Sequence, residues 1–471
     1  MDSARPRNYL ISSVIDHCLA FSDHLEPLRF RQYASKFPEG LLTCLGNFNT
    51  AIENKLGALI NDLDFQSLTD EEAEENVLRY STLYSYLYVA ASFVERSDIP
   101  HTIVELVQPI KRLMQQQCQL GDFELLLHPL PILNYSFFPL GALLSDVTTQ
   151  LSISDASITF PEQLVTIGFP GLETERILVH SLIAHELGHC LYIKHGLEQK
   201  LLTRVKPIEK ELDSLVKEWA ATKVGSTEAK ETPTGQHTLS DYISQVEIRS
   251  LVTRQINSIS KAWVKELTCD AIGYCLSGPA YLFASLDFLT LINPFDNDLG
   301  KHPPNRMRFL LLYKMLDEEK DFLEILDPKV KEFLDSWKNV TRKKSVKFSS
   351  PISRLAGNAI LNIYQHIIDE ATSAVGYNGL YSASKNTTEL QKLVKRINDH
   401  VPPNEILVNG VFNEAKFQSI LNSGWLVYLT GLGELQRELK VELWESKVKF
   451  NELIARAIEL NEVQRRWKEV Q

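Results

Sequence analysis

The chain has 471 residues, of which 44% are hydrophobic and 23% are charged. This composition is typical of a globular protein with room for two or three domains, and it excludes collagen-like, disordered and disulfide-stapled classes. The formal net charge of -11 gives no electrostatic reason to approach nucleic acid or anionic lipid, so we expect neither as a partner.

The six cysteines are scattered and form no CxxC pair, which favours a reducing, cytoplasmic location. The apolar stretch near the N-terminus is interrupted by Asp16, His17 and Asp23, so it does not fit a secretory signal. The longest apolar stretches, 129–144 and 273–295, are broken by Pro, Asn or Asp. We therefore expect no membrane insertion.

Residues 1–120 are expected to form a helical N-terminal region. From Asn8 to about Met114, apolar residues recur at three- and four-residue spacing. A capping box formed by Thr69 and Glu72 is predicted to open one of these helices.

Residues 121–315 are assigned to one central domain. Between 121 and 171 the sequence predicts short strands, and the segment 152–167 can supply an edge to which an extended peptide adds as a strand. A helix is predicted over 173–194 and a flexible inserted segment over about 223–239. Helical pattern resumes at Ser240 and runs past Gly273.

Residues 316–471 are predicted to form a helical C-terminal region that ends in an amphipathic stretch over 434–467. The terminal helical regions can dock a partner helix, although packing on their own domain is favoured. The expected fold class is mainly α (α+β), with a small sheet in the central region, flanked by helical N- and C-terminal regions.

His185, Glu186 and His189 form an HExxH pattern within SLIAHELGHCLYIKHG. Positions four residues apart lie on one face of a helix, so both imidazoles can reach a single ion, and Glu186 is placed to activate a metal-bound water. The alternative is a surface helix with unrelated histidines. Apolar neighbours argue against it, because a buried His-Glu-His set needs a metal or other partners. The pattern predicts one zinc ion per chain.

Three residues are candidates for the third protein ligand. His195 lies where a metzincin has its third histidine, but Tyr192 stands where such a helix needs a glycine to turn toward the metal. Glu209 follows at a thermolysin-like distance in a charged segment that is typical of an exposed helix. Glu266 lies among apolar residues, where a carboxylate needs a partner. We favour Glu266 as the third ligand. The alternative is that its carboxylate forms a buried ion pair with a lysine or arginine.

Several further residues are candidates for supporting roles. Asp270, four residues after the favoured ligand, is placed to accept a hydrogen bond from the far nitrogen of a ligating histidine. A tetrahedral oxyanion needs a donor besides the metal, and His302, Arg308 and Tyr274 are the candidates. Their structural alternatives are a turn histidine, a surface arginine and a core tyrosine. Two cysteines lie next to site residues, Cys190 after the second histidine and Cys269 before Asp270. Both can compete for metal or respond to oxidants, but we favour inert, buried thiols.

Three motifs occur in a characteristic order: HExxH at 185–189, ExxxD at 266–270, and HPPNRMR at 302–308. Together they resemble the HtpX-like and CAAX prenyl protease type of gluzincin metallopeptidase. The resemblance covers about residues 173–312, roughly a third of the chain.

The resemblance implies that residues 121–315 form a zincin-like metallopeptidase core with a small sheet, which is the catalytic domain of a zinc enzyme. It also assigns roles to particular residues. It implies that the general base is Glu186 and that His302 and Arg308 lie beside the active site, where they hold the substrate or the oxyanion. The residues that bind zinc by this resemblance are His185, His189 and Glu266.

The sequence thus predicts a zinc metallopeptidase, an endopeptidase that hydrolyses peptide bonds of a protein or peptide through a zinc-bound water activated by Glu186. Two alternatives stay open. One is a catalytically silent zincin-fold protein with a regulatory or binding role, and the other is a zinc hydrolase of a non-peptide substrate.

Overall fold

The computed structural model describes residues 7–60, 68–117, 123–151, 163–224, 239–292, 301–343 and 346–470. Over these residues the fold is mainly helical with small sheets, which confirms the mainly α class. The chain divides into two compact units, Met1–Glu175 and Arg176–Gln471. This division lies inside the segment that the sequence assigns to one central domain, and the domain boundaries given above stay predictions.

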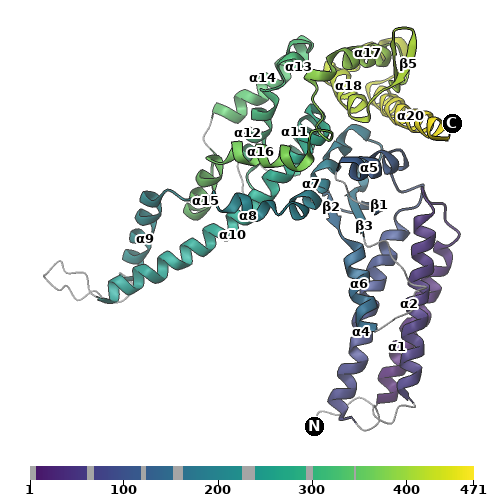
Figure 1. The fold of residues 1–471 in the computed structure, drawn as a ribbon, viewed down its shortest axis with the longest axis vertical. Helices are drawn as coiled ribbons and strands as arrows, with labels where there is room; N and C mark the ends of the chain where they lie inside the picture. Colours follow the sequence, from purple (N-terminus) through teal and green to yellow (C-terminus); the bar gives the residue numbers. More distant parts are fainter. Residues whose placement is uncertain are drawn as a thin grey trace. The chain divides into compact units, whose positions relative to one another are not determined.

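Long helices packed side by side make up most of the first unit (Figure 1). They enclose a core that includes Phe21, Phe48 and Leu83. The predicted capping box is confirmed: the backbone amide of Glu72 donates to the Thr69 hydroxyl at 3.3 Å, and the Thr69 amide donates to the Glu72 carboxylate at 2.9 Å. The helices are α1 (Arg7–Leu28), α2 (Phe37–Ile60), α4 (Asp70–Glu95), α5 (Val104–Gln117) and α6 (Leu140–Leu151).

A three-stranded sheet belongs to the same unit. Strand β3 (Gln163–Pro170) lies at its centre, parallel to β1 (Phe123–Leu130) and antiparallel to β2 (Ser136–Phe138). The expectation that 152–167 supplies an edge for an added peptide is therefore wrong for Thr166 and Ile167, which pair with β1 on one side and with β2 on the other. Residues 163–165 pair with β1, and for them the expectation stays a prediction. Residues 152–162 lie outside the described part of the chain. The short 3-10 turn η1 (Gly171–Glu173) follows β3.

The second unit is organised around α10 (Leu239–Ser277), a helix of 39 residues and about 60 Å. Its C-terminal half is buried almost throughout, from Trp263 to Ser277. Figure 1 shows α10 as the long teal helix against which neighbouring helices pack. Its neighbours are α7 (Ile183–Lys194), α8 (Leu197–Leu202), α9 (Glu209–Val224), α11 (Pro279–Ile292), α12 (Asn305–Leu316), α15 (Pro351–Leu361) and α16 (Tyr364–Val375).

Two sequence predictions change in this unit. The helix expected over 173–194 begins as the 3-10 segment η2 (Ile177–Leu182) and becomes α-helical only at Ile183. The inserted segment predicted at about 223–239 falls outside the described residues over 225–238, and its ends belong to α9 and α10.

Helix α18 (Phe417–Thr430) fixes the corner where α10 meets α11. The side chain of Asn422 accepts a hydrogen bond from the amide of Ala280 at 2.8 Å and donates to the carbonyl of Ser277 at 2.8 Å. Trp425 donates from its indole nitrogen to the carbonyl of Leu178 in η2, at 3.2 Å. The segments that precede the HExxH helix and follow α10 are thus both held by α18.

The remaining elements complete the second unit. The predicted amphipathic stretch at 434–467 forms two helices, separated at Lys440, which has a positive φ of 52°. None of the helices in the described ranges is long and apolar enough to cross a membrane. The elements not yet given are α13 (Lys320–Glu324), α14 (Pro328–Lys343), η3 (Ser384–Asn386), α17 (Thr387–Asn398), the hairpin β4 (Glu405–Val408) and β5 (Val411–Glu414), α19 (Gly433–Leu439) and α20 (Leu443–Val470).

Candidate metal centre

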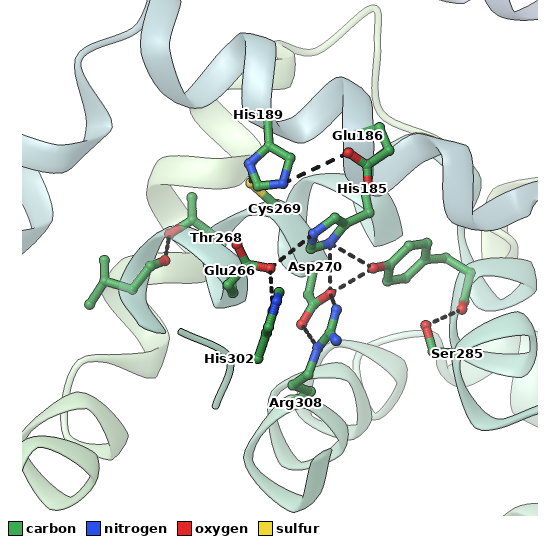
Figure 2. A network of polar contacts seen from close by, with 12 residues as sticks. His185, Glu186, His189, Glu266, Thr268, Cys269, Asp270, Ser285, His302 and Arg308 are labelled. Carbon is green, nitrogen blue, oxygen red and sulfur yellow. Dashed lines mark hydrogen bonds and ion pairs between the residues drawn. The ribbon is translucent and has the colours of Figure 1, made fainter. Parts of the chain in front are cut away.

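The HExxH residues lie on α7, whose apolar positions Leu187 and Leu191 are completely buried. The rings of His185 and His189, one turn apart, have centroids 4.9 Å apart and an interplanar angle of 88°. Figure 2 shows both rings beside the carboxylate of Glu186. The predicted helical spacing therefore places all three side chains at one place in the fold.

The second half of the site comes from α10, which packs directly against α7. The glycine of the HExxH motif makes this approach possible, since a Cβ on Gly188 would lie 2.8 Å from the Cα of Cys269 and 3.0 Å from its carbonyl oxygen. Only a residue without a side chain fits there. The close approach brings Glu266 and Asp270 of α10 up to His185.

Glu266 contacts two histidines through the same oxygen. Its Oε2 lies 3.3 Å from Nε2 of His185 and 3.3 Å from Nδ1 of His302. The His302 side chain, in the segment before α12, is 51% exposed, whereas that of Glu266 is 11% exposed. His302 therefore marks the side on which the site meets solvent.

Asp270 is the centre of a buried polar network (Figure 2). Its Oδ1 accepts hydrogen bonds from Nδ1 of His185 at 3.0 Å and from the hydroxyl of Tyr281 at 2.6 Å. Arg308 donates from Nε to Oδ2 at 2.7 Å and from Nη2 to Oδ1 at 2.6 Å. With Nδ1 engaged in this way, the nitrogen that His185 presents to Glu266 is Nε2.

His189 makes different contacts at its two nitrogens. Its Nε2 lies 4.0 Å from Oε2 of Glu186, and its Nδ1 lies 3.2 Å from Sγ of Cys269. The two motif histidines therefore each have one nitrogen toward a glutamate and the other toward a residue on α10.

The pKa values of the two histidines shift in opposite directions. Burial lowers the pKa of His185, but contacts with Asp270 and Glu266 outweigh burial and raise it to about 10. Burial, together with the charge of His185, lowers the pKa of His189 to about 3. The contacts with Asp270 and Glu266 favour the protonated form of His185, so a metal that binds its Nε2 must displace a proton there.

The pKa values of the three carboxyl groups of the site also shift in different directions. Burial raises the pKa of Glu186 above its ordinary value. Burial acts in the same sense on Glu266, but hydrogen bonds from two histidines hold its pKa well below the usual range. For Asp270, burial is outweighed by Arg308, which also holds the pKa well below the usual range. Glu186 is therefore the carboxylate best suited to take up a proton near neutral pH.

A metal ion can be held here. Among the described residues, His185, His189 and Cys269 offer ligand atoms that all lie within 4.8 Å of one another. Nitrogen, sulfur and carboxylate donors in such a group suit zinc. Glu266 is a further donor: its 3.3 Å separation from Nε2 of His185 matches the roughly 3.4 Å expected between two donors of one tetrahedral zinc ion. The structure thus offers Cys269 and Glu266 as candidates for the third ligand.

The other two candidate ligands lie in different surroundings. His195 ends α7, is followed by Gly196 at a φ of +58°, and has a pKa lowered by burial and by Lys194 and Lys200. Glu209 opens α9 and pairs with Arg249, with its side chain 72% exposed. His195 thus lies where a capping histidine would, and Glu209 lies on a solvated helix face. Both positions match the alternatives to metal binding.

Arg308 and Tyr274, two of the candidate oxyanion donors, lie in different surroundings. The alternative for Arg308, a surface arginine, is wrong, because Arg308 is 7% exposed and bound to Asp270 through two N–H groups. Tyr274 is buried, and among the described residues its hydroxyl has no hydrogen-bond partner. Burial, followed by the charge of Glu319, raises the pKa of Tyr274 well above its ordinary value, and these are the surroundings of a core tyrosine.

Tyr281 is a site residue that the sequence analysis missed. It lies at the start of α11, and its ring occupies the space beside Gly273, where a Cβ would be 2.6 Å from the ring. Its hydroxyl lies 2.6 Å from Asp270 and 3.2 Å from Nδ1 of His185. The one available signal was the glycine at 273 within a helix, because such a glycine often marks a close approach.

Comparisons with protein-family models, with curated proteins and with solved structures found no match. What this chain does is therefore inferred from its own residues and from the order of its motifs.

Proposed function

We propose that this chain is a zinc-dependent metallopeptidase of the gluzincin type, with one zinc ion bound by His185, His189 and Glu266. The observation that carries the proposal is the convergence of Nε2 of His185 and Oε2 of Glu266, which lie 3.3 Å apart beside the HExxH helix. Glu186 on that helix lies next to the second histidine. The order HExxH, ExxxD, HPPNRMR in the sequence supports the same assignment.

Glu266 is favoured over Cys269 as third ligand because of the nitrogen that each one faces. Glu266 faces Nε2 of His185, whose other nitrogen is bound to Asp270. Cys269 faces Nδ1 of His189, while Nε2 of that ring lies toward Glu186. Burial raises the pKa of the Cys269 thiol well above its ordinary value, which disfavours the thiolate that a metal needs.

The residues of the site can carry out peptide hydrolysis. Bound zinc would supply Lewis acidity toward the scissile carbonyl and would lower the pKa of a coordinated water. Glu186 takes the proton from the attacking water and returns it to the leaving amine, a role that suits a carboxyl whose pKa burial raises. His302, on the exposed side of the site, donates a hydrogen bond to the carbonyl oxygen of a protein or peptide substrate.

Arg308 enters the proposal in a different role from the one expected of it. Its guanidinium is buried and bound to Asp270, and Asp270 in turn holds His185. We therefore propose that Arg308 positions a ligand and does not touch the substrate. A cytoplasmic location stays a prediction, which rests on the scattered cysteines.

The test measures zinc content and peptide hydrolysis on the same preparations of full-length protein. Wild type and Glu186→Gln are each expected to carry about one zinc per chain, while hydrolysis of a peptide library falls by about 100-fold or more in the variant. Glu266→Gln is expected to lose the zinc. Glu209→Gln, an exposed carboxylate paired with Arg249, is the matched control and retains both zinc and activity.

Three outcomes would contradict the proposal in different ways. Wild type that binds zinc but cleaves neither casein nor a peptide library would favour a binding or regulatory role. Cleavage that is unchanged in Glu186→Gln would remove Glu186 as the base. Zinc that is retained in Glu266→Gln and lost in Cys269→Ser would make Cys269 the third ligand.

A further inference from the structure

The two histidines of the proposed metal centre are held by unlike partners at the nitrogens that face away from Glu186 and Glu266. Nδ1 of His185 donates to a carboxylate, that of Asp270, at 3.0 Å. Nδ1 of His189 lies 3.2 Å from a thiol, that of Cys269. A histidine that binds a metal through one nitrogen donates the hydrogen on the other, so each partner sets the orientation of its ring.

Cys269 is held firmly in place relative to α7. It is completely buried, and its backbone is the surface against which Gly188 packs, one residue before His189. A Cβ on Gly188 would lie 2.8 Å from the Cα and 3.0 Å from the Cβ of Cys269. The backbone of Cys269 therefore cannot move away from α7 unless the two helices separate.

We propose that Cys269 is a positioning residue for His189. Its sulfur accepts the hydrogen bond of the Nδ1–H group and fixes the ring with Nε2 toward the metal. Because sulfur is a weak acceptor, His189 is held less firmly than His185, whose partner is a carboxylate. This role rests on the proposed metal centre and extends it to a residue outside the HExxH and ExxxD motif positions.

The first measurement is the zinc affinity of full-length variants, determined by competition with a chromophoric chelator. Cys269→Val removes the acceptor but fills the buried space, and we expect it to bind zinc about 10-fold more weakly. Cys269→Ser restores an oxygen acceptor and is expected to stay close to wild type. The matched control is Cys275→Val, which replaces a buried thiol on the same helix that contacts Thr372, and it is expected to keep the wild-type affinity.

The second measurement is the absorption spectrum of the wild-type protein loaded with Co²⁺. A thiolate ligand gives Co²⁺ an intense charge-transfer band in the near ultraviolet, whereas nitrogen and oxygen ligands do not. A positioning thiol predicts a spectrum without this band. A band that is present in wild type and absent in Cys269→Ser would overturn the positioning role and make Cys269 a ligand.

The remaining outcomes also decide the question. Equal zinc affinity in wild type and Cys269→Val would overturn the positioning role while leaving the metal centre intact. Uptake of neither zinc nor cobalt by wild type would overturn the metal centre itself. If Cys269→Val does not fold, as judged by circular dichroism, Cys269→Ala takes its place, because it also removes the acceptor and is expected to bind zinc about 10-fold more weakly than Cys269→Ser. Equal zinc affinity in Cys269→Ala and Cys269→Ser would overturn the positioning role.

Discussion

Gly188 of α7 lies against Cys269 of α10 with no space between them for a side chain, because a Cβ on Gly188 would meet the Cα of Cys269 at 2.8 Å. The atoms that it would meet belong largely to the backbone and cannot turn aside. We expect Gly188→Ala to lower the free energy of unfolding by about 1–3 kcal/mol. Zinc binding should weaken as well, because the helices that carry the two halves of the site must separate.

Denaturant unfolding and zinc titration of Gly188→Ala measure both effects. The control is Gly57→Ala, since Gly57 lies within α2 with nothing within 4 Å of its added Cβ. That change is expected to be neutral or to stabilise by at most about 1 kcal/mol. Equal behaviour of the two variants would show that the helix contact does not require Gly188.

Tyr281→Phe removes a hydroxyl that contacts both Asp270 and His185. We expect zinc affinity to fall by about 10-fold, because the orientation of a ligating histidine then depends on fewer contacts. Tyr274→Phe is the matched control, since the hydroxyl of Tyr274 is buried without a hydrogen-bond partner among the described residues. Its loss should leave zinc affinity unchanged. Isothermal titration of zinc into both variants makes the comparison, and a larger effect of Tyr274→Phe would contradict it.

Arg308→Met leaves the carboxylate of Asp270 buried without its main counter-charge. Breaking a buried pair in this way typically costs about 3–5 kcal/mol, so we expect a loss of that size in the free energy of unfolding. Arg249→Met breaks exposed pairs with Asp213 and Glu209 and should cost about 1 kcal/mol or less. Chemical denaturation of both variants measures the two losses in the free energy of unfolding. Losses of equal size would contradict the prediction.

The pH dependence of the first unit is expected to contain a contribution from His128 on β1. Burial lowers the pKa of this histidine from 6.5 to about 4, and its ring lies beside that of Phe93, with the centroids 4.7 Å apart and an interplanar angle of 39°. Between these two values the unfolded chain binds a proton that the folded unit does not, so stability rises with pH. The contribution is complete above about pH 6.5 and is lost as the pH falls through 4, by about 3 kcal/mol in total.

Hydrogen exchange of the β1 amides in the full-length chain, followed from pH 7 to pH 5, measures this slope. His128→Phe keeps an aromatic ring beside Phe93 but cannot be protonated, and it should flatten the dependence. A slope that is the same in wild type and His128→Phe would show that other groups cause it.

Features that depend on local spacing were predictable from the sequence. The capping box of Thr69 and Glu72, the end of the HExxH helix at Lys194 and the common face of His185 and His189 follow from contacts within one or two helical turns. Asp270 was expected beside the far nitrogen of a ligating histidine, and Nδ1 of His185 lies 3.0 Å from it. That pairing could be predicted because an aspartate beside a ligating histidine commonly accepts a hydrogen bond from the nitrogen that does not bind the metal.

Features that depend on packing between distant segments were not predictable from spacing. The sequence by itself determined that His185, Glu186 and His189 lie within one helical turn of one another, because the residue types and their intervals are fixed along the chain. Only the tertiary structure decided that Arg308 is bound to Asp270, that Tyr281 and not Tyr274 contacts the network, and that β3 lies between two strands. The physical reason is that burial and partners arise where helices and strands meet, and in a single sequence those meeting points are not encoded by local periodicity.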